Sequence, residues 1–208
     1  MLMRYHKPML DTLERVATDF EADSSAELVF AVARRSDAYA DVPYKIGALC
    51  ALAVLLLVVY LPIQFNASWF WVDTVVAFAF GWLVGKAFPR LARVLVSHRR
   101  RKARVREAAE AVFINRGVSL TRERTGVLVY ISWLEQTVML LWDVGIEKRV
   151  PRTVLQAAKN EFERLPLFQN FPAAFEPALQ PFKKLFDEKL PRPPDDVNEI
   201  SNRPVVIR

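Results

Sequence analysis

Two long stretches of the chain are apolar on every side of a helix, and they lie close together in the sequence. Residues 46–63 carry no charged side chain, and residues 69–88 carry only Asp73 and Lys86, each near one end. About 18 helical residues rise roughly 27 Å, which is close to the hydrocarbon thickness of a bilayer. The pattern predicts a two-helix transmembrane hairpin over residues 45–89. The alternative, a hairpin buried in a soluble core, would require a larger chain to cover it.

The rest of the chain alternates between helical and strand patterns. Apolar side chains at helical spacing predict helices over residues 9–22, 90–116, 151–164 and 172–190. Short apolar runs predict strands over residues 26–33, 125–133 and 137–142. The last two strands form a hairpin through residues 134–136.

This order of elements predicts a small sheet with helices packed over it. The first strand must pair with the two later strands, so the transmembrane hairpin interrupts one discontinuous α/β domain made of residues 1–44 and 90–190. Residues 191–208 are rich in Pro, Asp and Asn and are predicted to form an extended tail.

Positive charge is concentrated after the second apolar stretch, in a chain whose formal net charge is +6. The short connection at residues 64–68 has no Lys or Arg. The positive-inside rule therefore predicts that both termini lie in the cytoplasm and that the connection lies outside. The membrane is expected to be of the bacterial inner (cytoplasmic) type. Five of the basic side chains are predicted to contact lipid headgroups: Arg99, Arg100, Arg101, Lys102 and Arg104. Aromatic residues for base stacking are missing from this run, which disfavours nucleic acid as a partner.

Small residues recur at a spacing of four in both apolar stretches. Gly81 and Gly85 form such a pair in the second stretch, and Gly47 and Ala51 form one in the first. This spacing allows two helix backbones to approach closely. The contact could form within the hairpin or between two copies of the chain, and the pattern does not choose between them.

Three segments carry a family resemblance: residues 117–132 around Thr-Arg-Glu-Arg-Thr-Gly-Val-Leu, residues 142–146 (Trp-Asp-Val-Gly-Ile), and residues 192–199 (Arg-Pro-Pro-Asp-Asp-Val-Asn-Glu). Together they resemble the membrane branch of the TPM domain family. The resemblance implies an α/β/α sandwich with Rossmann-like layering. Roles in that family include photosystem repair, acid phosphatase activity and help in assembling membrane proteins.

Asp143 is the best candidate for a ligand-binding side chain, because it ends a predicted strand just before Gly145. With Glu123 and Glu147 it could bind a divalent cation through oxygen atoms. The alternative is a turn-forming Asp that accepts from its own backbone. Apart from that cation, no cofactor is expected, since His6 and His98 are isolated and no His/Cys cluster has metal-ligand spacing.

Phosphatase chemistry would need a nucleophile in an anion cradle or a metal-activated water. The sequence has neither a Cys-x5-Arg loop nor an Asp-x-Asp-x-(Thr/Val) pair. We therefore predict a non-enzymatic accessory or interaction module at the cytoplasmic face of the membrane, with another membrane protein or a second copy as its partner. The alternative is a membrane-bound, cation-dependent phosphatase or other hydrolase.

Overall fold

The computed structural model describes residues 7–60, 69–164, 171–193, 195 and 198–207. The predicted turn at residues 64–68, and Pro194, Asp196 and Val197 of the tail motif, lie outside these ranges. The chain divides into two compact units, one of residues Met1–Ser36 with Lys102–Arg208 and one of residues Asp37–Arg101. We call them the α/β unit and the helical unit.

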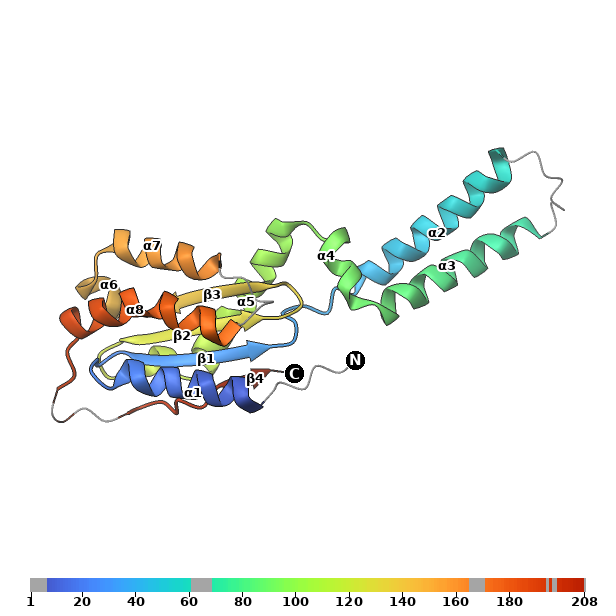
Figure 1. Ribbon diagram of the computed structural model, residues 1–208. Helices are drawn as coiled ribbons and strands as arrows, with labels where there is room; N and C mark the ends of the chain where they lie inside the picture. Colours follow the sequence, from blue (N-terminus) through green and yellow to red (C-terminus); the bar gives the residue numbers. More distant parts are fainter. Residues whose placement is uncertain (1–6, 61–68, 165–170, 194, 196–197, 208) are drawn as a thin grey trace. The chain divides into compact units, whose positions relative to one another are not determined.

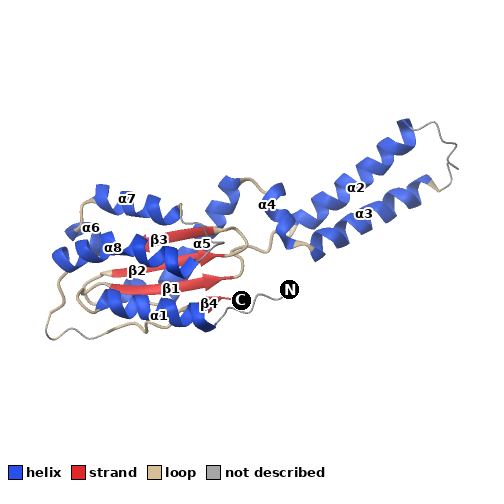
Figure 2. Cartoon of the chain, in the orientation of Figure 1, coloured by secondary structure: helices blue, strands red, loops and turns tan. Residues whose placement is uncertain are grey.

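A mixed sheet of four strands forms the centre of the α/β unit (Figure 2). Its order is β3-β2-β1-β4, with strands β1 (Glu27–Ala33), β2 (Gly126–Ser132), β3 (Thr137–Trp142) and β4 (Val205–Ile207). Strand β1 runs parallel to β2 and to β4, whereas β3 is antiparallel to β2. The predicted pairing of the first strand with the strands after the apolar stretches is therefore confirmed.

Helices cover both faces of this sheet, which explains why β1 and β2 are buried along their whole length. On one face, Phe30 and Val129 pack in a core with Leu13 of α1 (Lys7–Glu21). Helices α7 (Arg152–Glu163) and α8 (Phe171–Lys189) add further side chains to that core. On the other face, Leu128 and Tyr130 pack with Val105 and Ala109 of α5 (His98–Asn115).

The helical unit contains two long apolar helices, α2 (Asp41–Tyr60) and α3 (Phe70–Ala87), which lie along each other (Figure 1). By length and composition, both helices could cross a membrane. Only 11% of the apolar window of each is buried. The helices therefore pack on one another without being enclosed in a soluble core, and leave large apolar side chains exposed.

The prediction of one helix over residues 90–116 is wrong. The structure has a short 3-10 helix at Pro89–Leu91, then α4 (Ala92–Leu95), an extended Val96, and α5 from His98. Pro89 cannot continue the hydrogen bonding of α3. The hydroxyl of Ser97 accepts from the Arg100 backbone N–H, so Ser97 starts a new helix.

Two further elements differ from the prediction. Helix α6 (Val144–Arg149) follows β3, where no helix was predicted. The last described residues of the tail form β4 and add a strand to the edge of the sheet, where no strand was predicted.

Candidate functional site

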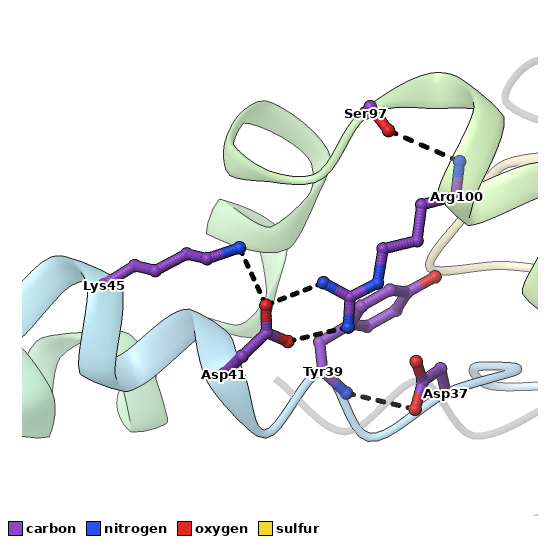
Figure 3. Close-up of polar contacts among 6 residues, drawn as sticks. All are labelled: Asp37, Tyr39, Asp41, Lys45, Ser97 and Arg100. Carbon is purple, nitrogen blue, oxygen red and sulfur yellow. Dashed lines mark hydrogen bonds and ion pairs between the residues drawn. The ribbon is translucent and has the colours of Figure 1, made fainter.

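The carboxylate of Asp41, at the start of α2, binds Arg100, which lies near the last residue of the helical unit (Figure 3). Asp41 Oδ2 lies 2.7 Å from Arg100 Nη1, and Asp41 Oδ1 lies 2.9 Å from Arg100 Nη2. Lys45, one helical turn further on, contacts the same carboxylate at 2.8 Å. The two parallel bonds fix the orientation of both side chains. We call Asp41, Lys45 and Arg100 the Asp41 clamp.

Glycines line the contact between α2 and α3. A Cβ atom on Gly81 would lie 2.8 Å from the Ile46 carbonyl oxygen, and one on Gly85 would lie 2.6 Å from the Cα atom of Pro43. A Cβ atom on Gly47 would meet the backbone oxygen of Phe78 at 2.9 Å. The three glycines therefore serve contact within the hairpin, and Ala51 is half-buried one turn beyond Gly47.

Aromatic side chains and a lysine gather at the same end of the hairpin as the clamp. The rings of Tyr44 and Trp82 meet edge to face, with centroids 6.4 Å apart. The Lys86 ammonium lies 3.9 Å from the centroid of the Trp82 ring. Tyr and Trp side chains combine an apolar ring with one polar group, and they are enriched where a membrane meets water.

Three of the five basic residues predicted to contact lipid are held in ion pairs with the chain's own carboxylates. Arg100 belongs to the Asp41 clamp, Lys102 lies 2.6 Å from Glu163, and Arg104 lies 2.7 Å from Glu107. Arg99 is exposed and Arg101 is half-buried. Within the described ranges, these last two make no ion pair, so their charges are the most available to an external anion.

Asp143 is built into the fold. Its side chain is 5% exposed; one carboxylate oxygen accepts from the Val144 N–H at the start of α6, and the other lies 2.8 Å from Arg124 Nε. Arg124 has a φ of +59°, and its carbonyl accepts from the Gly145 N–H. These two bonds join the loop before β2 to the turn after β3, so Arg124, Asp143 and Gly145 have a structural role.

The other two predicted carboxylates have arginine partners of their own. Glu123 lies 2.6 Å from Arg149, and Glu147 accepts from Arg152 and from the Trp142 indole, both at 3.1 Å. These bonds, the one from Arg152 foremost, hold the pKa of Glu147 below its usual value. In the described residues, no group of three or more His, Cys, Asp or Glu side chains could hold a metal ion.

A buried polar network that sequence reasoning missed lies where parallel strands β1 and β2 end. Ser36 donates to the Ser132 hydroxyl at 2.8 Å and lies 3.2 Å from the Tyr130 hydroxyl. Glu135 accepts from the Ser132 hydroxyl and from the Ser36 backbone N–H. Burial raises the pKa of Tyr130. The network fixes the segment through which the chain leaves β1, and nothing in the spacing of its four residues predicts it.

A second missed pair lies at the opposite end of β1. Glu21 and Glu27 are 7% and 6% exposed, respectively. Glu21 accepts from the Leu28 N–H at 2.8 Å, and Glu27 accepts from the Glu199 N–H at 3.1 Å. Burial raises the pKa of Glu21 to about 7, and the negative charge of Glu27 adds to this. Glutamates at the end of a helix and the start of a strand usually stay in solvent, so only the structure identifies them.

Comparison with known proteins gives one informative likeness. No family model matches the chain, and no curated protein matches it. Among solved structures, the NMR structure of the BA42 protein from the psychrophilic bacterium Bizionia argentinensis is similar, with a TM-score of 0.57 and 13% identity over 100% of this chain and 99% of that chain. At such low identity the likeness concerns the fold alone, and it supports a small mixed α/β fold for this chain.

Proposed function

We propose that the chain is a membrane-anchored, TPM-like accessory module at the cytoplasmic face of a bacterial inner membrane. The observation that carries the proposal is the exposure of the apolar side chains along α2 and α3. Exposed leucine and valine on both helices, and exposed phenylalanine on α3, would be costly in water and favourable in lipid. The TPM-like assignment rests on the motif resemblance and on the mixed α/β fold.

The orientation follows from the two ends of the hairpin. The end with the Asp41 clamp also carries Lys86, Arg90, Arg93, Arg99 and Arg101, and its aromatic residues suit the depth of the headgroups. This end faces the cytoplasm. Arg99 and Arg101 contact anionic headgroups, since both have charges that no carboxylate of the described chain neutralises.

An accessory role has more support than a hydrolase role. Each of the carboxylates Glu123, Asp143 and Glu147 is neutralised by a separate arginine. A cation would have to break these ion pairs to bind there. The anchored α/β unit instead offers a folded surface to another membrane protein or to a second copy of the chain.

Membrane insertion is testable with one arginine. Leu56 lies within α2 and is 45% exposed, whereas Leu120 of the α/β unit is 76% exposed. Arginine in the middle of a membrane helix costs about 2.5–3.5 kcal/mol. We therefore expect L56R to lower the fraction of the chain that resists alkaline carbonate several-fold, and the matched control L120R to behave as wild type. Wild-type chain that carbonate releases completely would refute the anchor.

The accessory role has a separate test. The chain, extracted in mild detergent and purified through an affinity tag, is expected to bring a second protein or a second copy with it at a fixed ratio. Repeated recovery of the chain alone, as a monomer, would overturn this part of the proposal and leave the anchor intact.

A further inference from the structure

Asp73 lies deeper in the apolar hairpin than its place near the start of α3 suggests. Helices α2 and α3 run in opposite directions, and the backbone of Phe78 lies against Gly47 (Figure 1). Asp73 comes five residues before Phe78, so it lies level with a point about five residues beyond Gly47 in α2. Helix α2 continues past this level to Tyr60 without a charged side chain. Asp73 therefore lies inside the apolar length of the hairpin.

The charges at the clamp end of the hairpin give the depth of Asp73. Asp73 and Lys86 are 13 residues apart in α3, which corresponds to a rise of roughly 20 Å. Along α2, the level of Asp73 lies roughly 10 Å beyond Lys45. The hydrocarbon core of a bilayer is about 30 Å thick. With the two lysines at one boundary of that core, Asp73 lies in about its middle third.

Asp73 is on a side of α3 that α2 does not cover. Phe78 and Gly81 contact α2, whereas the Asp73 side chain is exposed. Val76 and Phe80, three and seven residues further on, share its side of the helix and are 60% and 66% exposed. Within residues 7–60 and the other described ranges, no hydrogen bond or ion pair reaches the Asp73 carboxylate. A carboxylate at this depth would face lipid hydrocarbon.

We propose that Asp73 is the docking point for a transmembrane helix of a partner protein, and that this helix carries an arginine or a lysine at the same depth. The inference rests on the membrane anchor proposed above and names the chemistry of its partner. A charged side chain inside a membrane is costly, so such residues face a protein partner or water. A basic side chain beside Asp73 would compensate its charge, and Val76 and Phe80 would pack next to that contact.

A second copy of the chain cannot supply the basic residue. Neither residues 46–63 nor residues 69–85 contain Arg or Lys. In a second copy inserted in the same direction, Lys45 and Lys86 would lie roughly 10–20 Å from the depth of Asp73. A symmetric contact would instead bring two Asp73 carboxylates together, and like charges repel. The partner is therefore a different protein.

Fluorescence energy transfer in phosphatidylcholine vesicles tests the docking. The full-length chain carries a donor dye after Arg208, and a synthetic polyleucine transmembrane helix with one central arginine carries the acceptor. We expect the arginine helix to bind about tenfold more tightly than an all-leucine helix. Equal binding of the two helices, or equal binding when asparagine replaces the arginine, would overturn the proposal.

Two variants separate docking through Asp73 from insertion of the hairpin. D73L removes the carboxylate and suits lipid, so it is expected to insert as well as wild type and to lose the preference for the arginine helix. The matched control V75A changes a side chain that is 59% exposed on another side of α3, and it should keep that preference.

The remaining outcomes distinguish this inference from the proposed anchor. Flotation with the vesicles measures insertion, and wild-type chain that does not float would refute the anchor itself. A D73L chain that floats and still prefers the arginine helix would contradict the docking point while the anchor stands. Energy transfer between two labelled copies of the chain that disappears in D73L would assign the site to a second copy and overturn the inference.

Discussion

Single residues in this chain take their roles from partners that lie far away in the sequence. Asp143 shows this well: an aspartate that ends a strand before a glycine is compatible with both a cation ligand and a turn cap. In the structure Asp143 caps α6, and Arg124, in the loop before β2, pairs with it at 2.8 Å. The sequence around Asp143 does not predict Arg124 as its partner, because the two residues are brought together by the pairing of β2 with β3.

Substitution at Asp143 provides a test at this scale. Removing an N-cap side chain costs about 0.5–2 kcal/mol, and D143A also leaves Arg124 without its carboxylate. We expect D143A to lower the free energy of unfolding by about 2 kcal/mol, and D143N, which keeps a capping oxygen, to lower it by less. Chemical denaturation of the detergent-solubilised chain measures both.

The control for this prediction is E147Q, which changes an exposed ion pair worth about 0–1 kcal/mol. Divalent cations are expected to leave the unfolding midpoint of wild-type chain unchanged. A midpoint that rises with added Mg²⁺ or Ca²⁺ and no longer does so in D143N would restore the cation-site hypothesis.

At the scale of elements, hydrophobic periodicity predicted most helices and strands correctly, because both faces of β1 and β2 are buried and α1 has one clear apolar side. It failed where a local cap competes with the periodic pattern. Ser97 restarts the helix although the residues on both sides of it favour helix, so residues 90–116 are not continuous. Strand β4 was missed because three residues after a polar tail give no periodic signal.

The Asp41 clamp should contribute a measurable coupling between Asp41 and Arg100, which both belong to the helical unit. A double-mutant cycle of D41A and R100A is expected to give a larger coupling energy than an ordinary surface ion pair, since two parallel hydrogen bonds join the side chains. R100K keeps the positive charge but cannot form two parallel hydrogen bonds to the carboxylate, so it should lose most of the coupling energy. The readout is chemical denaturation followed by tryptophan fluorescence.

The matched control for the clamp is the pair Arg106 and Glu110, an ion pair one turn apart within α5. Its coupling is expected to be about 0.3–0.5 kcal/mol. A clamp coupling no larger than this would mean that the contact between Asp41 and Arg100 does not hold the ends of the hairpin.

At the scale of the whole molecule, the discontinuous α/β unit was predictable, because a lone strand before the apolar stretches needs partners and only later strands can supply them. The two polar clusters at the ends of β1 were not predictable. Each gathers residues from segments that meet only through the pairing of β1 with β2 and β4.

The orientation of the hairpin in the membrane can be tested with a reporter enzyme. A reporter enzyme active only outside the cytoplasm, fused after Arg208, should be silent, whereas the same reporter inserted between Asn66 and Ala67 should be active. The expected contrast follows from the positive charge at the clamp end of the hairpin. Strong activity of the fusion after Arg208 would reverse the orientation.

Because α2 and α3 lie between β1 and β2 in the sequence, the ribosome makes these two strands at different times. Strand β1 leaves the ribosome first, and its parallel neighbour β2 follows only after the whole of α2 and α3 has been made. During that interval a strand that is apolar from Leu28 to Ala33 has no sheet to join, and such segments are prone to aggregate. A ribosome that pauses within the hairpin therefore leaves β1 as a bare segment that chaperones would have to shield until translation resumes.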